Sequence, residues 1–144
     1  MKKLFLIFVF IVSSFAANWS GDWAGKVSWA MNYESAKRLA LQTHKPILVD
    51  LALTNCPPCH YLADHMYTDT KIANFINKNF VPVLIIVDQE KVPTEVAQFF
   101  DGATPDLIIM DPKKGVSIAQ FHFQREFVNN KYKFIDYLKK GLKK

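Results

Sequence analysis

The chain has 144 residues, of which 50% are hydrophobic and 22% are charged, a composition that excludes a disordered, collagen-like or multi-span membrane protein. This length predicts one domain, which can bury enough surface to fold without cross-links. The net charge of +5 is uneven, because residues 131–144 hold six lysines and one acid, whereas residues 17–130 carry a net −2. We expect no binding to nucleic acid and interpret the basic tail as the solvated face of a surface helix, with weak attraction to anionic lipid or an acidic partner as the alternative.

Residues 1–16 have the pattern of a signal peptide. Lys2 and Lys3 are followed by an uninterrupted apolar run over residues 4–12, and Ser14-Phe15-Ala16 fits the small-x-small cleavage pattern. The apolar run is short for a membrane span, although an uncleaved anchor is the alternative. We therefore expect an exported protein, periplasmic or secreted, that contacts the membrane only through this segment.

Residues 17–31 form an extension that contains three tryptophans, Trp19, Trp23 and Trp29. We expect these indole rings to pack onto the following domain, residues 32–144, and not to bind a ligand. The first predicted helix spans residues 33–44, with Asn32 as its N-cap and Pro46 just beyond its end.

Four segments have the pattern of strands, and helical segments alternate with them. The predicted strands are residues 47–53, 81–87, 107–110 and 117–123, of which the first three are continuous apolar runs and the last alternates. The remaining predicted helices are residues 56–66, 70–78, 94–100 and 128–142. This order predicts an α/β domain of three layers around a mixed or parallel central sheet. Ligands of such domains bind at the carboxyl ends of the strands.

Two cysteines, Cys56 and Cys59, lie three positions apart where the first predicted strand ends and a helix begins. A disulfide between them closes too short a loop to cross-link the fold, and an oxidising compartment favours a redox function for such a pair. Free backbone N–H groups at a helix start stabilise a thiolate, which makes Cys56 the candidate nucleophile. Cys59, one turn later, is the candidate resolving thiol.

Three further residues around the cysteines are candidates for the site. Pro57 and Pro58 restrict the dipeptide between the cysteines and are compatible with a first helical turn. Asp50 lies inside the strand that leads to Cys56. A buried aspartate has a raised pKa, so Asp50 is the candidate base that takes the proton of Cys59.

The segment Lys45 to Leu51 followed by Cys56-Pro57-Pro58-Cys59 resembles the active-site strand and motif of the thioredoxin superfamily, in particular its exported bacterial branch. Thr104-Pro105, ahead of the third predicted strand, matches the position of the cis-proline of that family. The resemblance covers about residues 29–142 and implies a thioredoxin fold, a mixed sheet and thiol:disulfide exchange without a cofactor or metal. It also implies that Pro105 is cis and faces Cys56, and that Thr104 offers backbone hydrogen bonds to an extended substrate segment.

Two departures from the family pattern concern the surroundings of the site. The tryptophan usual before the first cysteine is Asn55 here, so the aromatic surface beside the site is missing. A lysine that faces the buried aspartate in thioredoxin has no counterpart in residues 81–87. We therefore expect Asp50 to be more strongly desolvated, and protonated at neutral pH.

Three alternatives remain open at this point. Cys56 to His60 also matches the C-x-x-C-H motif of covalent haem attachment, with His60 and either His65 or Met66 as axial ligands. The same histidines could hold zinc with the cysteines, although they do not share a helix face well. A third alternative is a thioredoxin-fold binding module or holdase whose disulfide is inert.

The implied partners are proteins with thiols or disulfides, and the implied state is a monomer. The dipeptide Pro57-Pro58 contains no histidine, which favours a reductant of protein disulfides. A reductant in an oxidising compartment needs an electron donor, which we expect to be a membrane thiol reductant.

Overall fold

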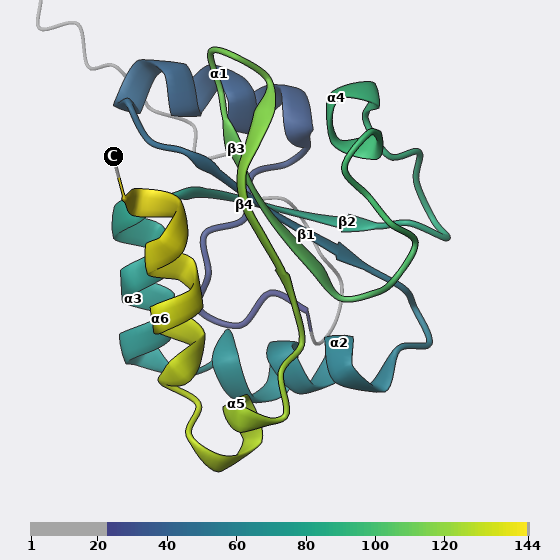
Figure 1. Ribbon diagram of the computed structural model, residues 1–144, viewed down its shortest axis with the longest axis vertical. Helices are drawn as coiled ribbons and strands as arrows, with labels where there is room; N and C mark the ends of the chain where they lie inside the picture. The colour runs from purple at the N-terminus through teal and green to yellow at the C-terminus, as the bar shows by residue number, and fades with distance from the viewer. Residues whose placement is uncertain (1–22, 144) are drawn as a thin grey trace, which may run out of the picture.

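The computed structural model describes residues 23–143, so the predicted signal segment 1–16, Trp19 and Lys144 lie outside the described residues. Four strands form one mixed sheet in the order β2-β1-β3-β4 (Figure 1). The strands are β1 (Ile47–Ala52), β2 (Val81–Ile86), β3 (Asp106–Asp111) and β4 (Val116–His122). β1 is parallel to β2, whereas β3 is antiparallel to both of its neighbours. The predicted three-layer α/β architecture with a mixed sheet is confirmed.

Helices cover both faces of the sheet. One face carries α1 (Tyr33–Thr43) and α4 (Thr94–Ala97), and the other carries α2 (Pro57–Tyr61), α3 (Thr70–Asn79), α5 (Glu126–Asn129) and α6 (Lys133–Lys139) (Figure 1). Each face has its own apolar cluster. Within the described residues, no helix is both long and apolar enough to span a membrane.

The central strand β1 contributes to both clusters because successive side chains of a strand point to opposite faces. Ile47, Val49 and Leu51 pack toward α1, and Leu48 and Ala52 pack toward α2 and α3. All six residues of β1 are buried, as expected for a strand with a neighbour on each side and helices on both faces.

The extension that precedes α1 runs along the edge strand β2. Pro82 in β2 has no N–H to donate, which is tolerated at an edge, and its carbonyl accepts from Ala30 N at 2.8 Å. The side chain of Asn77 on α3 accepts from Ser28 N and donates to the carbonyl of Lys26. These contacts attach the extension to the sheet and to α3.

Helix α1 begins as predicted, with the Asn32 side chain accepting from Ser35 N at 2.8 Å. The predicted helix 56–66 is present as α2 followed by a π-helical turn, η1 (Leu62–Met66). The predicted helix 94–100 is shorter, because α4 ends at Ala97.

The predicted helix 128–142 is not continuous. The segment forms the end of α5, then α6 and a final 3₁₀ turn, η2 (Lys140–Leu142). Asn130 between α5 and α6 is extended, with φ −148°, and its side chain accepts from Tyr132 N. Such local side-chain bonds compete with a helix. Tyr132 is exposed, whereas Phe127 and Phe134 are fully buried.

Candidate functional site

The two cysteines form a disulfide at the junction between β1 and α2, with Cα atoms 5.2 Å apart. Cys56 is the N-cap of α2, and its Sγ accepts from Cys59 N at 3.3 Å. Pro57 and Pro58 occupy the first two helical positions, where the missing N–H groups cost no helical hydrogen bond. Cys59 points inward and is 1% exposed, whereas Cys56, at 5%, lies nearer the surface.

The loop before β3 lies beside Cys56. The Thr104 hydroxyl donates to Cys56 Sγ at 3.4 Å, and the peptide bond between Thr104 and Pro105 is cis. The structure thus brings together Cys56, Thr104 and Pro105, which are about fifty residues apart in the chain.

Asp50 lies on the α2 face of the sheet, the face on which Cys59 packs. Its register partners on the neighbouring strands are Leu84 and Leu107, and both belong to the same apolar cluster as Cys59. Paired residues of a sheet share a face, so the carboxyl group is surrounded by the cluster that contains Cys59. The residue is 2% exposed.

The two carboxyl oxygens of Asp50 differ in their surroundings. The hydroxyl of Tyr67 donates to Oδ2, whereas Oδ1 is buried and has no hydrogen-bond partner among the described residues. The pKa of Asp50 is raised to about 7, mainly by burial. The hydrogen bond from Tyr67 lowers this pKa, and the Asp106 carboxylate raises it by a smaller amount. Asp50 therefore exchanges its proton near neutral pH.

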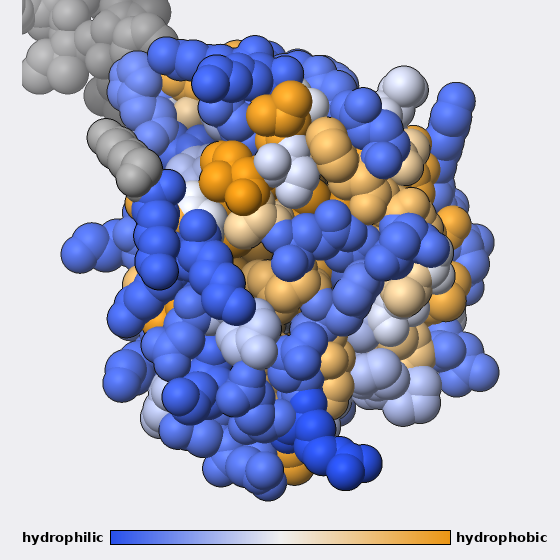
Figure 2. Space-filling view, in the orientation of Figure 1, coloured by the Kyte–Doolittle hydropathy of each residue, from blue (hydrophilic) through white to orange (hydrophobic). Residues whose placement is uncertain are grey.

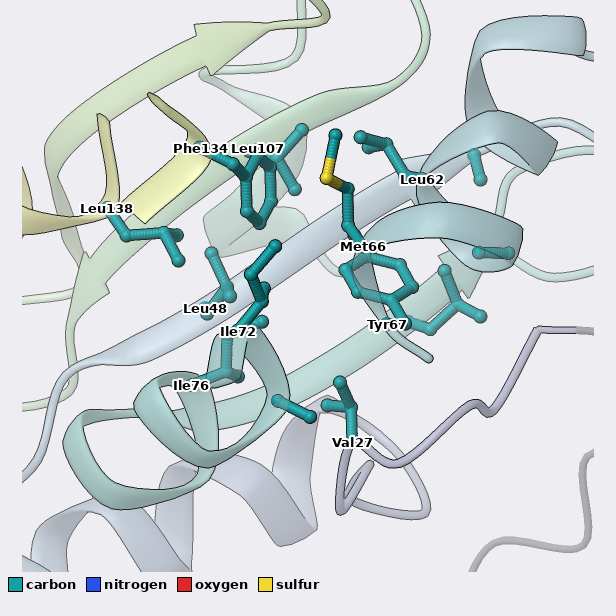
Figure 3. Close-up of a cluster of buried hydrophobic side chains, with 14 of the residues drawn as sticks. Val27, Leu48, Leu62, Met66, Tyr67, Ile72, Ile76, Leu107, Phe134 and Leu138 are labelled. Atoms are coloured by element: carbon teal, nitrogen blue, oxygen red, sulfur yellow. The ribbon is translucent and has the colours of Figure 1, made fainter. Parts of the chain in front are cut away.

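Tyr67 is a site residue that the sequence did not reveal. It follows the π-helical turn, and its backbone N–H donates to the carbonyl of Leu62, five residues earlier. Figure 3 shows its ring within the buried cluster, near Met66 and Leu62. The predicted helix 56–66 ends one residue before Tyr67, so the sequence analysis did not consider Tyr67 as a partner of Asp50.

An aromatic ring from the extension lies against α2. The Trp23 ring stacks on His60 with centroids 4.4 Å apart, and His60 Nε2 donates to the carbonyl of Thr54 at 2.8 Å. Trp29 is buried against Tyr67. The expectation that the tryptophans pack onto the domain therefore holds for Trp23 and Trp29.

A second polar cluster lies behind the Thr104-Pro105 loop. His122 on β4 contacts the carbonyl of Pro105 through Nδ1 at 3.1 Å and Asp101 Oδ2 through Nε2 at 2.9 Å. A carbonyl and a carboxylate only accept, so both contacts are hydrogen bonds at the same time when the ring is protonated. Asp101, Asp106 and His122 also have metal-ligand atoms within 4.8 Å of one another, but both nitrogens of His122 are engaged by Pro105 and Asp101.

The charges of this cluster depend on one another. Burial lowers the pKa of His122, but the hydrogen bonds to Pro105 and Asp101 and the Asp106 carboxylate raise it by more, so that the net shift is upward. Burial raises the pKa of Asp106 to about 6, although the Gln120 amide donates to both of its oxygens.

A hollow of the surface lies at the other end of the sheet. Its volume is about 580 Å³, and its lining includes Pro46 just before β1, Leu41 on α1 and Ile118 on β4. On the face seen in Figure 2, apolar side chains gather between polar ones. Since Cys56 follows the opposite end of β1, this hollow is not part of the cysteine site.

The solved structures that resemble this chain are thioredoxin-like. A protein described as DsbH oxidoreductase matches with 20% identity and a TM-score of 0.59, over 79% of this chain and 88% of its own. A thioredoxin from Thermus thermophilus matches with 18% identity and a TM-score of 0.61, over 81% and 91%. A putative disulphide-isomerase from Bacteroides thetaiotaomicron matches with 18% identity and a TM-score of 0.67, over 83% and 96%. No curated protein matches the chain significantly.

The fold and the paired cysteines define a thioredoxin-like protein whose chemistry is thiol:disulfide interchange. Residues 20–140 match the family model Thioredox_DsbH, described as a protein of unknown function, DUF255. The chain belongs to this DsbH-type thioredoxin family.

The imidazolium of His122 can be tested by an NMR titration. Its midpoint should lie above the ordinary 6.5 and should fall in Asp101→Asn, which removes the carboxylate that accepts from Nε2. Because the folded pKa is raised, the contribution of His122 to stability should be complete below pH 6.5 and should be lost as the pH rises through the folded pKa.

The same substitution at the exposed Asp136 on α6 serves as the control and should leave the midpoint unchanged. If the His122 midpoint is the same in Asp101→Asn and in the unaltered protein, the contact with Asp101 does not stabilise the protonated ring.

Proposed function

We propose that this protein is an exported thiol:disulfide oxidoreductase that reduces disulfides of other proteins through the Cys56–Cys59 pair. The observation that carries the proposal is the position of Cys56. Its sulfur lies at the start of α2, at the end of a buried strand, with the Thr104 hydroxyl 3.4 Å away. The signal-peptide pattern of residues 1–16 supports export, and hence a periplasmic or secreted protein.

Cys56 is the nucleophile in this proposal. Two groups donate to its sulfur, the backbone N–H of Cys59 and the hydroxyl of Thr104. Hydrogen bonds to a thiolate stabilise it, so the same donors favour the thiolate form of reduced Cys56. The Cys56 thiolate attacks a disulfide of the client protein, forms a mixed disulfide, and releases the first client thiolate.

Cys59 and Asp50 complete the exchange. Cys59 is buried in the apolar cluster on the sheet face that carries the Asp50 side chain. The Asp50 pKa of about 7 suits a base that works near neutral pH. The Cys59 thiol transfers its proton to Asp50 and attacks Cys56, which forms the intramolecular disulfide and releases the second client thiolate.

The loop at Thr104 and Pro105 is the proposed docking site for the client. It lies next to Cys56 and precedes β3, so an extended client segment can pair with the Thr104 backbone as an added strand. Pro57 and Pro58 form the other side of the contact, since both follow Cys56 directly and Pro57 is exposed. Such a contact recognises the backbone of the client and not its side chains, which suits protein substrates of several kinds.

The arrangement of His60 opposes the haem alternative. Its ring is stacked on Trp23 and hydrogen-bonded to Thr54, and Cys59 is buried, so neither is free to attach a large planar group. His65 stacks on the Tyr61 ring and does not converge with His60 on a zinc site. The alternative of an inert binding module is tested by the Cys56→Ser variant below.

Insulin reduction coupled to dithiothreitol tests the proposed activity. The rate should fall to the uncatalysed background in Cys56→Ser, because this substitution removes the attacking sulfur. Cys59→Ser should accumulate a mixed disulfide that can be isolated together with the client, because the resolving sulfur is missing. An unchanged rate in Cys56→Ser would exclude exchange at this pair and would favour the binding module.

The direction of electron flow follows from the reduction potential. The dipeptide Pro57-Pro58 carries no cation that would stabilise the reduced thiolate, so we expect a potential below about −150 mV against a glutathione reference, on the reducing side of the range of this fold. A membrane thiol reductant is then the expected electron donor. A higher potential would identify an oxidant instead.

A further inference from the structure

Among residues 23–143, the buried carboxyl group of Asp50 has a single hydrogen-bond donor, and this donor is uncharged. No lysine or arginine forms an ion pair with it among the described residues, and its partners across the sheet, Leu84 and Leu107, are apolar. The Tyr67 hydroxyl alone compensates the carboxylate, at Oδ2. Since a buried unpaired charge is unstable, this single bond determines how readily Asp50 ionises.

Tyr67 is held in place by contacts on every side. It is fully buried, and Trp29 and Phe134 pack against its ring in edge-on arrangements, with centroids 5.0 and 6.3 Å away. Its carbonyl accepts from Lys26 N at 2.7 Å, and its N–H donates to Leu62. The hydroxyl therefore has a fixed position and does not follow Asp50 to other rotamers.

The π-helical turn places Tyr67 on the sheet-facing side of the helix that carries Cys59. Cys59 and Leu62 are three residues apart, which puts them on one helix face. Leu62 and Tyr67 are five apart and close the i to i+5 bond of η1, which puts them on one face as well. Both Cys59 and Tyr67 thus belong to the cluster that surrounds Asp50.

We infer that Tyr67 is the positioning residue for Asp50: its hydroxyl fixes Oδ2 and leaves the unpartnered Oδ1 as the atom that exchanges a proton with Cys59. This inference rests on the proposed function, because only a resolving thiol has a proton to give. The observation behind it is the asymmetry of the carboxyl group, with one oxygen hydrogen-bonded and the other buried without a partner.

Resolution of the mixed disulfide begins at the Cys59 thiol. The Cys59 S–H bond breaks and its proton moves to Oδ1 of Asp50. The Cys59 sulfur then attacks Cys56, a new S–S bond forms between the two cysteines, and the bond from Cys56 to the client sulfur breaks. The client sulfur leaves with the electron pair and takes up the proton that Asp50 holds, directly or through solvent. The two cysteines are oxidised by two electrons and the client disulfide is reduced by two.

The charged and titratable groups around Asp50 define the direction of the expected effect. They are Cys59 on α2, Tyr67 after η1 and, farther away on β3, Asp106. Burial, the Asp50 charge and the hydrogen bond to it raise the pKa of Tyr67 well above 10, so its hydroxyl remains a donor. The Tyr67 bond lowers the Asp50 pKa, so its removal moves that pKa upward, away from neutral pH.

The test is the titration of Asp50 in the oxidised protein, where the disulfide-bonded cysteines do not titrate. The carboxyl-carbon NMR resonance of Asp50, identified by its absence in Asp50→Asn, should have a midpoint near 7. In Tyr67→Phe the midpoint should rise by about one pH unit, since the variant keeps the ring and removes the donor. The pH profile for resolution of the mixed disulfide should move upward by a similar amount.

The control is Tyr61→Phe on α2. The Tyr61 ring packs on His65 and Phe123, and its hydroxyl has no hydrogen bond to the described residues, so the Asp50 midpoint should not change. An unchanged midpoint in Tyr67→Phe would overturn the inference. If Tyr67→Phe does not fold, the ring resonance of Tyr67 in the unaltered protein should show an inflection at the Asp50 midpoint, and a flat response would also overturn it.

The two proposals fail in distinguishable ways. If the protein catalyses no disulfide exchange but its Asp50 midpoint still depends on Tyr67, the Tyr67–Asp50 interaction is supported and the proposed activity is contradicted. That outcome would also remove the role of Oδ1 in resolution. If the protein is active but its Asp50 midpoint does not depend on Tyr67, the proposed activity is supported and the positioning role of Tyr67 is contradicted.

Discussion

The hydrogen bond between the Tyr67 hydroxyl and the buried Asp50 carboxyl is the interaction on which the site depends. β1 is the most enclosed strand of the sheet, and an ionised side chain in its middle is costly unless a donor compensates it. Tyr67 provides that donor without adding a charge. The result is a carboxyl group that changes its protonation state near neutral pH, on the sheet face whose apolar cluster contains both cysteines.

The extension before α1 contributes to this site although it is distant in sequence. Lys26 N donates to the carbonyl of Tyr67, and the chain approaches so closely that a Cβ at Gly25 would collide with the same carbonyl. Gly25 also has φ +52°, which a glycine adopts without strain. Trp29 covers the Tyr67 ring, and Trp23 lies against His60 after Cys59. The extension therefore fixes both the donor to Asp50 and the outer side of α2.

The sequence predicts those parts of the protein that local patterns determine. The continuous apolar run of β1, the alternation of β4 and the position of Cys56 between a strand and a helix are local, and the structure has all of them. The helix predicted over residues 128–142 is interrupted at Asn130, whose side chain bonds to the backbone of Tyr132, and apolar periodicity does not reveal such a bond.

The residues that complete the site were not predictable in the same way. Tyr67 lies one residue beyond the predicted helix 56–66, and no residue pattern in this segment indicates the π-helical turn that precedes it. His122 and Asp101 meet behind Pro105 through the pairing of β3 with β4, so their contact depends on register. The family resemblance placed Thr104 and Pro105, which spacing alone could not have brought to Cys56.

The central claim is that Asp50 acts as the base for Cys59, and rapid-mixing kinetics of Asp50→Asn test it most directly. The asparagine keeps an oxygen that can accept from Tyr67 but cannot take a proton at neutral pH. We expect formation of the mixed disulfide by Cys56 at nearly the original rate and its resolution by Cys59 slowed about 100-fold, in the range of general acid–base catalysis. Equal slowing of both steps, or of neither, would contradict the account.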